Sequence, residues 1–73
     1  MVIKEKKRKK EIITKRKKQI IVYISKGYTN DDIAKEMGYS TSLINQELLE
    51  MFKDTETLSR AHLVSWAYQN NIL

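Results

Sequence analysis

Residues 27–40 have the sequence GYTNDDIAKEMGYS, and this stretch decides the fold. Thr29, with Asp32 three positions later, forms a capping box, in which the hydroxyl and the acid satisfy backbone amides at the start of a helix. Gly38 ends that helix, since glycine enters the left-handed conformation without a steric penalty. Ser40 then caps a second helix. Two helices joined by a tight glycine corner predict a helix-turn-helix.

Helices are also expected on both sides of this stretch. The chain has no proline and only two glycines, so few positions interrupt helical structure. Apolar residues recur on one helical face before Gly27, after Ser40 and again after Ser59. The expected class is all-α, a four-helix helix-turn-helix domain with a basic N-terminal arm. The predicted helices are about residues 14–26, 30–37, 41–54 and 59–70, with a left-handed exit at Asn70-Asn71.

The charge of the chain is concentrated near its N-terminus. Residues 1–18 contain ten Lys or Arg and two Glu, whereas residues 19–73 contain four Lys or Arg and seven Asp or Glu. We therefore predict a basic arm over residues 1–12, either separate or continuing the first helix, and one domain over residues 13–73. Lysines that neutralise phosphates release counterions and bind polyanions without sequence preference. A solvated lysine tail explains the same composition equally well.

The composition argues against several classes of protein. There is one His and no Cys, and neither a His-Glu-x-x-His motif nor a glycine-rich phosphate loop is present, so we expect no enzyme, no cofactor and no metal. Glu47, Glu50 and Asp54 share one helical face and would at most bind a cation weakly; a solvated face is the favoured interpretation. The longest apolar run, Ile20–Ile24, is far shorter than a membrane span. The expected location is the cytoplasm.

The glycine corner is part of a longer pattern, which is formed without gaps by Thr14, Arg16, Ile20, Ile21, Gly27, Thr29, Asn30, Asp32, Ile33, Ala34, Met37, Gly38, Ser40, Ile44, Met51, Arg60, Leu63, Val64 and Ala67. With this pattern the chain resembles the LuxR/GerE family of helix-turn-helix domains over about residues 13–73. The resemblance implies that the helix over about 41–54 enters the major groove and that the helix over about 59–70 pairs two copies of the chain. It thus implies a stand-alone, homodimeric, sequence-specific transcription regulator associated with the nucleoid, whose partner is double-stranded DNA.

The candidate DNA contacts centre on the third predicted helix. Asn45 and Gln46 carry amides that can pair with adenine through two hydrogen bonds, while Thr41 and Ser42 lie at the helix start, near any phosphate. Ordinary polar surface is the alternative interpretation of these four residues. For Arg16 a salt bridge within the domain is the alternative. The further candidates are Thr29, Asn30, Leu49, Lys53, Lys15, Arg16, Lys9 and Lys10.

The third predicted helix also departs from the family pattern. Asn45 replaces a common basic residue, Glu47 replaces His, and Asp54-Thr55 replaces Lys-Leu. These changes make the helix acidic, so we expect the basic arm to provide most of the attraction to phosphates. A glutamate facing a base edge could instead accept a hydrogen bond from cytosine N4.

The fourth predicted helix supplies the candidate dimer contacts, which are Leu63, Trp66, Ala67 and Asn70. Trp66 lies at a flank of the apolar face, where it either contacts a partner chain or completes a small core.

The alternative function is a protein-interaction module on the same fold, which binds RNA polymerase, a sigma factor or another regulator, as a phage-encoded modulator would. Binding of RNA or anionic lipid by the lysines ranks last, because no aromatic residues are interleaved with them.

Overall fold

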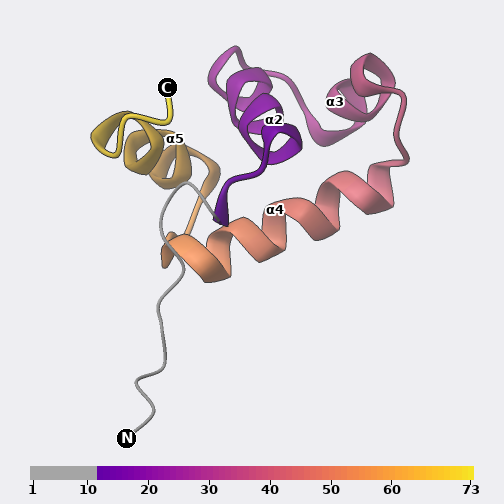
Figure 1. Cartoon of the computed structure of the whole chain (residues 1–73). Helices are drawn as coiled ribbons and strands as arrows, with labels where there is room; N and C mark the ends of the chain where they lie inside the picture. The colour runs from indigo at the N-terminus through magenta and orange to yellow at the C-terminus, as the bar shows by residue number, and fades with distance from the viewer. Residues whose placement is uncertain (1–11) are drawn as a thin grey trace, which may run out of the picture.

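The computed structural model describes residues 12–73, and these residues form four helices without strands. The helices are α2 (Lys15–Ser25), α3 (Asn30–Met37), α4 (Thr41–Thr55) and α5 (Arg60–Gln69). In Figure 1, α4 is the long helix along one side of the molecule, and α2, α3 and α5 lie above it. The predicted all-α class and all four predicted helices are confirmed, with boundaries within two residues of those expected.

Each of the four helices begins at a hydroxyl residue that accepts a backbone N–H three positions later. The distances to the accepting oxygen are 3.1 Å at Thr14, 3.1 Å at Thr29, 3.1 Å at Ser40 and 3.0 Å at Ser59. At Thr29 the backbone N–H also donates to the Asp32 carboxylate at 3.2 Å, which completes the predicted capping box. That backbone hydrogen bond, followed by the one with the Thr29 side chain, lowers the pKa of Asp32 below its ordinary value.

The corner between α3 and α4 depends on the left-handed conformation of Gly38, whose φ is 73°. This conformation lets the backbone N–H of Tyr39 return to the carbonyl of Ala34 at 2.9 Å, which closes α3. Asn71 provides the predicted left-handed exit after α5, with a φ of 59°. Glu56, with a φ of 56°, ends α4 in the same way, although nothing in the sequence pattern indicated it.

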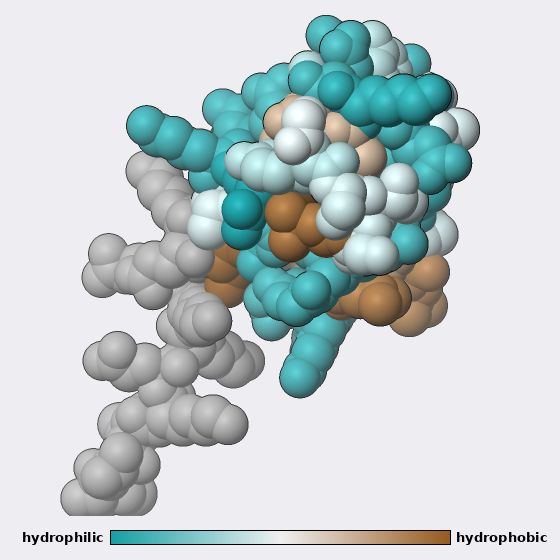
Figure 2. All heavy atoms as spheres, turned by 90° about the vertical axis from the view of Figure 1, so that its right-hand side faces the viewer, coloured by the Kyte–Doolittle hydropathy of each residue, from teal (hydrophilic) through white to brown (hydrophobic). Residues whose placement is uncertain are grey.

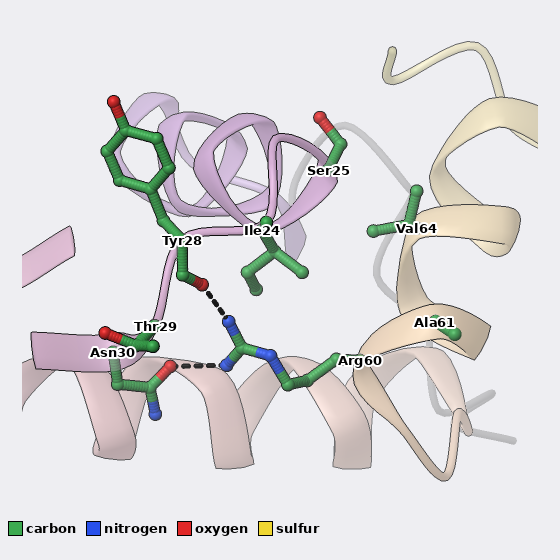
Figure 3. Close-up of a pocket in the computed structure, with 9 residues that line it drawn as sticks. Ile24, Ser25, Tyr28, Thr29, Asn30, Arg60, Ala61 and Val64 are labelled. Atoms are coloured by element: carbon green, nitrogen blue, oxygen red, sulfur yellow. Dashed lines mark hydrogen bonds between the residues drawn. The ribbon is translucent and has the colours of Figure 1, made fainter. Parts of the chain in front are cut away.

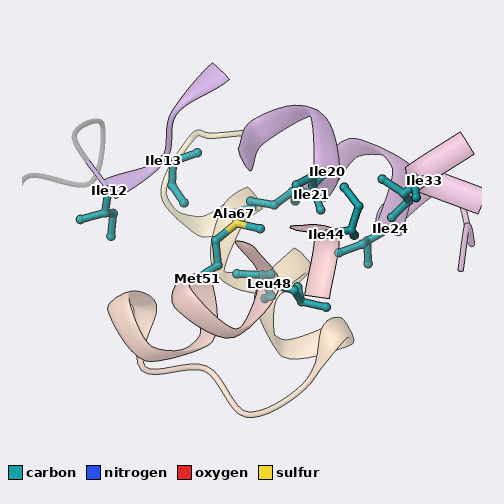
Figure 4. Close-up of a cluster of buried hydrophobic side chains, with 12 residues drawn as sticks. Ile12, Ile13, Ile20, Ile21, Ile24, Ile33, Ile44, Leu48, Met51 and Ala67 are labelled. Carbon is teal, nitrogen blue, oxygen red and sulfur yellow. The ribbon is translucent and has the colours of Figure 1, made fainter. Parts of the chain in front are cut away.

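The core lies where the four helices meet, and every helix contributes at least one side chain to it (Figure 4). The largest fully buried side chains are Ile20, Ile21, Ile33, Ile44, Met51 and Leu63. Ile12, the last residue of the predicted arm, is also buried, with 9% of its surface exposed. Burying the apolar side chain of an isoleucine is favourable in free energy, which explains why Ile12 packs against the core.

Candidate nucleic-acid interface

One side of α4 is exposed along the whole helix. An α-helix turns by about 100° per residue, so positions i, i+3, i+4, i+7 and i+11 form a stripe about 100° wide. On α4 this stripe consists of Ser42, Asn45, Gln46, Leu49 and Lys53, all of them exposed. Ile44, Leu48 and Met51 on the other side are buried. The structure therefore gathers five of the predicted contact residues on one face, which we call the α4 stripe.

The end of the molecule that carries α3 and the start of α4 is largely hydrophilic. Figure 2 views the molecule from the right-hand side of Figure 1, and polar residues cover most of this face around smaller apolar areas. Thr41, at the first turn of α4, donates its hydroxyl hydrogen to the Asp31 carboxylate of α3 at 2.9 Å. This bond connects the two helices and uses the hydroxyl hydrogen of Thr41, a residue predicted to lie near a phosphate.

A chain of hydrogen bonds runs from α5 to the α4 stripe. Figure 3 shows its first part, the bonds from Arg60 to Asn30 and to Tyr28. Arg60 donates through Nη1 to Asn30 Oδ1 and through Nη2 to the Tyr28 carbonyl, each at 2.5 Å. Asn30 in turn donates through Nδ2 to Asn45 Oδ1 at 2.6 Å. Asn30, predicted as a DNA contact, thus also links two other helices. We call Arg60, Asn30 and Asn45 the amide relay.

Two acidic residues of α4, Glu47 and Glu50, pair with basic residues of α2. Glu47 has only 5% of its surface exposed, and its Oε1 accepts from Arg16 Nε at 2.6 Å. Lys17 Nζ lies 3.8 Å from Glu47 Oε2 and 3.0 Å from Glu50 Oε1. Two interpretations of Glu47, as part of a solvated face and as a contact with cytosine, were wrong, because its carboxylate is buried against two cations.

Arg16 therefore takes part in a salt bridge inside the domain, which was the alternative to a DNA contact. Its guanidinium also lies over the Tyr39 ring, 5.5 Å from the centroid. The hydrogen bond to Glu47 raises the pKa of Arg16 above its ordinary value, and the contact with Tyr39 adds to this effect. Sequence reasoning placed Arg16 and Glu47 on their helices, but it gave no signal that they meet.

The remaining predicted basic contacts are less constrained. Lys15, at the first residue of α2, and Lys53, in the last turn of α4, are both exposed. Lys9 and Lys10, with the rest of the basic arm up to residue 11, lie outside the described residues. Thr29 is exposed, and its hydroxyl oxygen is engaged in capping α3.

The predicted dimer contacts on α5 fall into two groups. Leu63 and Ala67 have no exposed surface, so their side chains belong to the core of their own chain and are not available to a partner. Trp66 is partly buried against that core, and Asn70 donates through Nδ2 to the Trp66 carbonyl at 2.8 Å. The outward side of α5 instead presents Ala61, Ser65 and Tyr68, all of them exposed.

Three further features of residues 12–73 concern metal binding, the single histidine and membrane-spanning helices. Among residues 12–73, no three His, Cys, Asp or Glu side chains are grouped closely enough to hold a metal ion. His62 is exposed, and its Nδ1 accepts the backbone N–H of Leu58 at 3.1 Å. No helix in this part of the chain is both long enough and apolar enough to cross a membrane.

Comparisons with known proteins relate the sequence to one bacterial family. The family model of bacterial regulatory proteins of the luxR family, named GerE, matches residues 11–67. The response regulator proteins VraR of Staphylococcus aureus, Staphylococcus saprophyticus and Staphylococcus epidermidis are each 27% identical over 63 residues, which are 86% of this chain. The match spans only 30% of the length of these relatives. No solved structure matches the chain at the same level of significance.

The matched region extends from the last residue before the described part to the last turn of α5, and so it includes the helix-turn-helix and most of the core. The family consists of DNA-binding regulators and not of enzymes. The chain therefore belongs to the luxR family of bacterial regulatory proteins, and α2 to α5 form the helix-turn-helix domain of that family.

Proposed function

We propose that this chain is a sequence-specific transcription regulator that inserts α4 into the major groove of DNA. The observation that carries the proposal is the α4 stripe, in which the amides of Asn45 and Gln46 are exposed side by side. Amide side chains on the outer face of such a helix can make hydrogen bonds to base edges. The inward pairing of Glu47 supports the proposal, because it removes one negative charge from the surface that would meet phosphates.

Contacts with the DNA backbone would come from the borders of this stripe and from the basic arm. Ser42 and Lys53 lie at the two ends of the stripe, and Lys15 is exposed at the start of α2. The basic arm adds Lys9, Lys10 and the neighbouring lysines. Such contacts fix the position of the protein on the duplex but carry no sequence information. The protein would act in the cytoplasm, on the DNA of the nucleoid.

Removing residues 1–11 is expected to weaken binding to every DNA sequence and to flatten its salt dependence. Each phosphate contact that is lost should reduce the slope of log K against log salt by about 0.9. The matched variant is Gln46→Ala, which should lose discrimination at one base pair and keep the original slope. The DNA affinity of each variant is measured by fluorescence anisotropy with a selected and a scrambled duplex over a series of salt concentrations. An unchanged slope after the deletion would exclude the basic arm from phosphate binding.

We also propose that two copies of the chain pair through the outward side of α5. The small side chains of Ala61 and Ser65 allow two helices to approach closely, and Tyr68 adds apolar surface, with 59% of it exposed. Trp66, which is partly buried against the core, remains a predicted contact at the side of this surface. Two-fold pairing would place two α4 helices against symmetric half-sites.

The dimer model predicts that Tyr68→Glu shifts the chain to monomer without unfolding it. A charge placed on each copy at a two-fold contact repels its equivalent and loses the apolar burial. Sedimentation equilibrium gives the association constant, which should fall by about tenfold or more, and circular dichroism should remain unchanged. The control is Gln69→Glu, which adds the same charge one residue away, at the edge of the outward side. An equal effect from both variants would indicate general charge repulsion instead of a contact at Tyr68.

A protein-interaction module is the second candidate, favoured by one specific observation. Leu49 has 67% of its surface exposed in the middle of the α4 stripe, and an exposed leucine is as suited to a protein partner, such as RNA polymerase or another regulator, as to a thymine methyl. A gel-shift assay with random genomic fragments in about 150 mM salt separates the two candidates. Retention of specific fragments supports the DNA regulator, and binding of all fragments at the same weak level supports the interaction module.

A further inference from the structure

The amide relay constrains which end of the Asn45 side chain can meet a base. A guanidinium has only donors, so the atom of Asn30 that lies 2.5 Å from Arg60 Nη1 must be its oxygen. The amide nitrogen of Asn30 then points the other way and donates to Asn45 at 2.6 Å. The accepting atom of Asn45 must therefore be Oδ1. The orientation of both amides follows from one charged residue, Arg60.

Arg60 is itself well fixed. Its second nitrogen, Nη2, donates to the carbonyl of Tyr28, in the turn just before α3, so the guanidinium makes two bonds to adjacent parts of the chain. Asn30 is the first residue of α3, and Arg60 is the first residue of α5. Figure 3 shows the Arg60 side chain reaching from α5 toward Tyr28 and Asn30. The relay thus connects the start of α5 with the exposed surface of α4.

We infer that Arg60 and Asn30 are positioning residues that make Asn45 a hydrogen-bond donor toward DNA. This inference rests on the proposed function, since it concerns how Asn45 reads a base. With Oδ1 held toward α3, the end of the exposed amide left for a base is Nδ2. Pairing with adenine through both ends of the amide, as the sequence led us to expect, would require Oδ1 to leave Asn30.

A donor selects base edges that present acceptors. In the major groove guanine offers N7 and O6 and thymine offers O4, whereas cytosine offers only the N4 donor and adenine offers a donor beside its acceptor. The base pair that faces Asn45 is therefore expected to place guanine, or secondarily thymine, against this residue.

The variant Asn30→Asp should reverse this preference. Aspartate has nearly the shape of asparagine and keeps an oxygen for Arg60, but it also places an oxygen opposite Asn45. Asn45 must then turn its amide and donate Nδ2 to residue 30, which leaves Oδ1 for the DNA. An acceptor selects cytosine N4 or adenine N6. The ratio of guanine to cytosine at this one position should fall by roughly tenfold, the discrimination of one hydrogen-bonded base contact.

Two controls separate this effect from charge and from loss of fold. Asn71→Asp adds the same charge at an exposed left-handed residue beyond the end of α5, and it should leave the base preference unchanged. Arg60→Lys keeps a positive charge but cannot make the two bonds of the guanidinium, so it should broaden the preference at this position without reversing it. Circular dichroism checks that each variant is folded.

The orientation of the amides is tested in the free protein by nuclear magnetic resonance. In the natural sequence, the side-chain NH₂ of Asn30 should exchange slowly with solvent and that of Asn45 rapidly; in Asn30→Asp the NH₂ of Asn45 should become the protected one. Fast exchange of both amides in the natural sequence would overturn the relay, whether or not the protein binds DNA.

Selection of bound duplexes from a random pool tests the use of the relay. A guanine or thymine preference that Asn30→Asp converts to cytosine or adenine is the expected result. The same preferred base in both proteins would overturn the relay and leave the proposed function standing. If the natural sequence selects no duplex at all while its amides show the predicted exchange, the proposed function fails, and the role of the relay in reading bases fails with it.

Discussion

Replacing Leu63 by alanine is expected to destabilise the domain by about 2–5 kcal/mol, the range for truncating a large buried side chain. Leu63 has no exposed surface and belongs to the cluster that joins all four helices. A domain of this size has a free energy of unfolding of only about 4–11 kcal/mol in total. At the lower end of this range, a single truncation would leave a substantial fraction of the molecules unfolded at moderate temperature. Urea unfolding followed by circular dichroism measures the loss.

Two other leucines provide matched controls for the same substitution. Leu58 has 89% of its surface exposed in the loop between α4 and α5, so Leu58→Ala should change the free energy of unfolding by no more than about 0.5 kcal/mol. Leu49→Ala should be equally harmless to stability, but under the proposed function it weakens DNA binding. If Leu63→Ala left the urea midpoint unchanged and only dissociated a dimer, Leu63 would be an interface residue after all.

The fold could be predicted from the sequence because its signals are local. A cap such as Thr29 with Asp32 involves residues three positions apart, and the corner at Gly38 depends on one backbone conformation. Apolar residues recur on one face of each helix, and this periodicity identifies the side that is buried. Ile33 of α3 and Ile44 of α4, for example, are fully buried. Each of these signals lies within one or two turns of helix. This is why the boundaries agree within two residues.

The side-chain contacts of the site could not be predicted in this way. Arg16 and Glu47 are 31 residues apart, and Asn30 and Arg60 are 30 residues apart. Whether such residues meet depends on how the helices pack, and periodicity on one helix does not contain that information. The resemblance to the family marked Arg60 as a matching position but gave no partner for it. The exit of α4 at Glu56 was missed because a left-handed residue is usually glycine or asparagine.

The ion pair between Arg16 and Glu47 is expected to be energetically asymmetric. Arg16→Met leaves the Glu47 carboxylate buried without its 2.6 Å partner, and among the described residues only the Lys17 ammonium, at 3.8 Å, remains paired with it. A buried polar group that loses its hydrogen bond costs about 1–3 kcal/mol, and more when it is charged. Glu47→Met should cost less, because the Arg16 side chain is already 44% exposed and its guanidinium can turn to water.

The double variant Arg16→Met with Glu47→Met should therefore be more stable than Arg16→Met alone, because it removes the buried charge together with its partner. Urea unfolding of the natural sequence, the two single variants and the double variant gives the coupling free energy between Arg16 and Glu47.

The same double variant also tests whether Arg16 contacts DNA. If Arg16 acts only within the domain, the salt slope of DNA binding stays that of the natural sequence, whereas a lost phosphate contact reduces it by about 0.9. A double variant less stable than Arg16→Met would mean that Glu47 has another partner, and the burial of Glu47 against α2 would then need a different explanation.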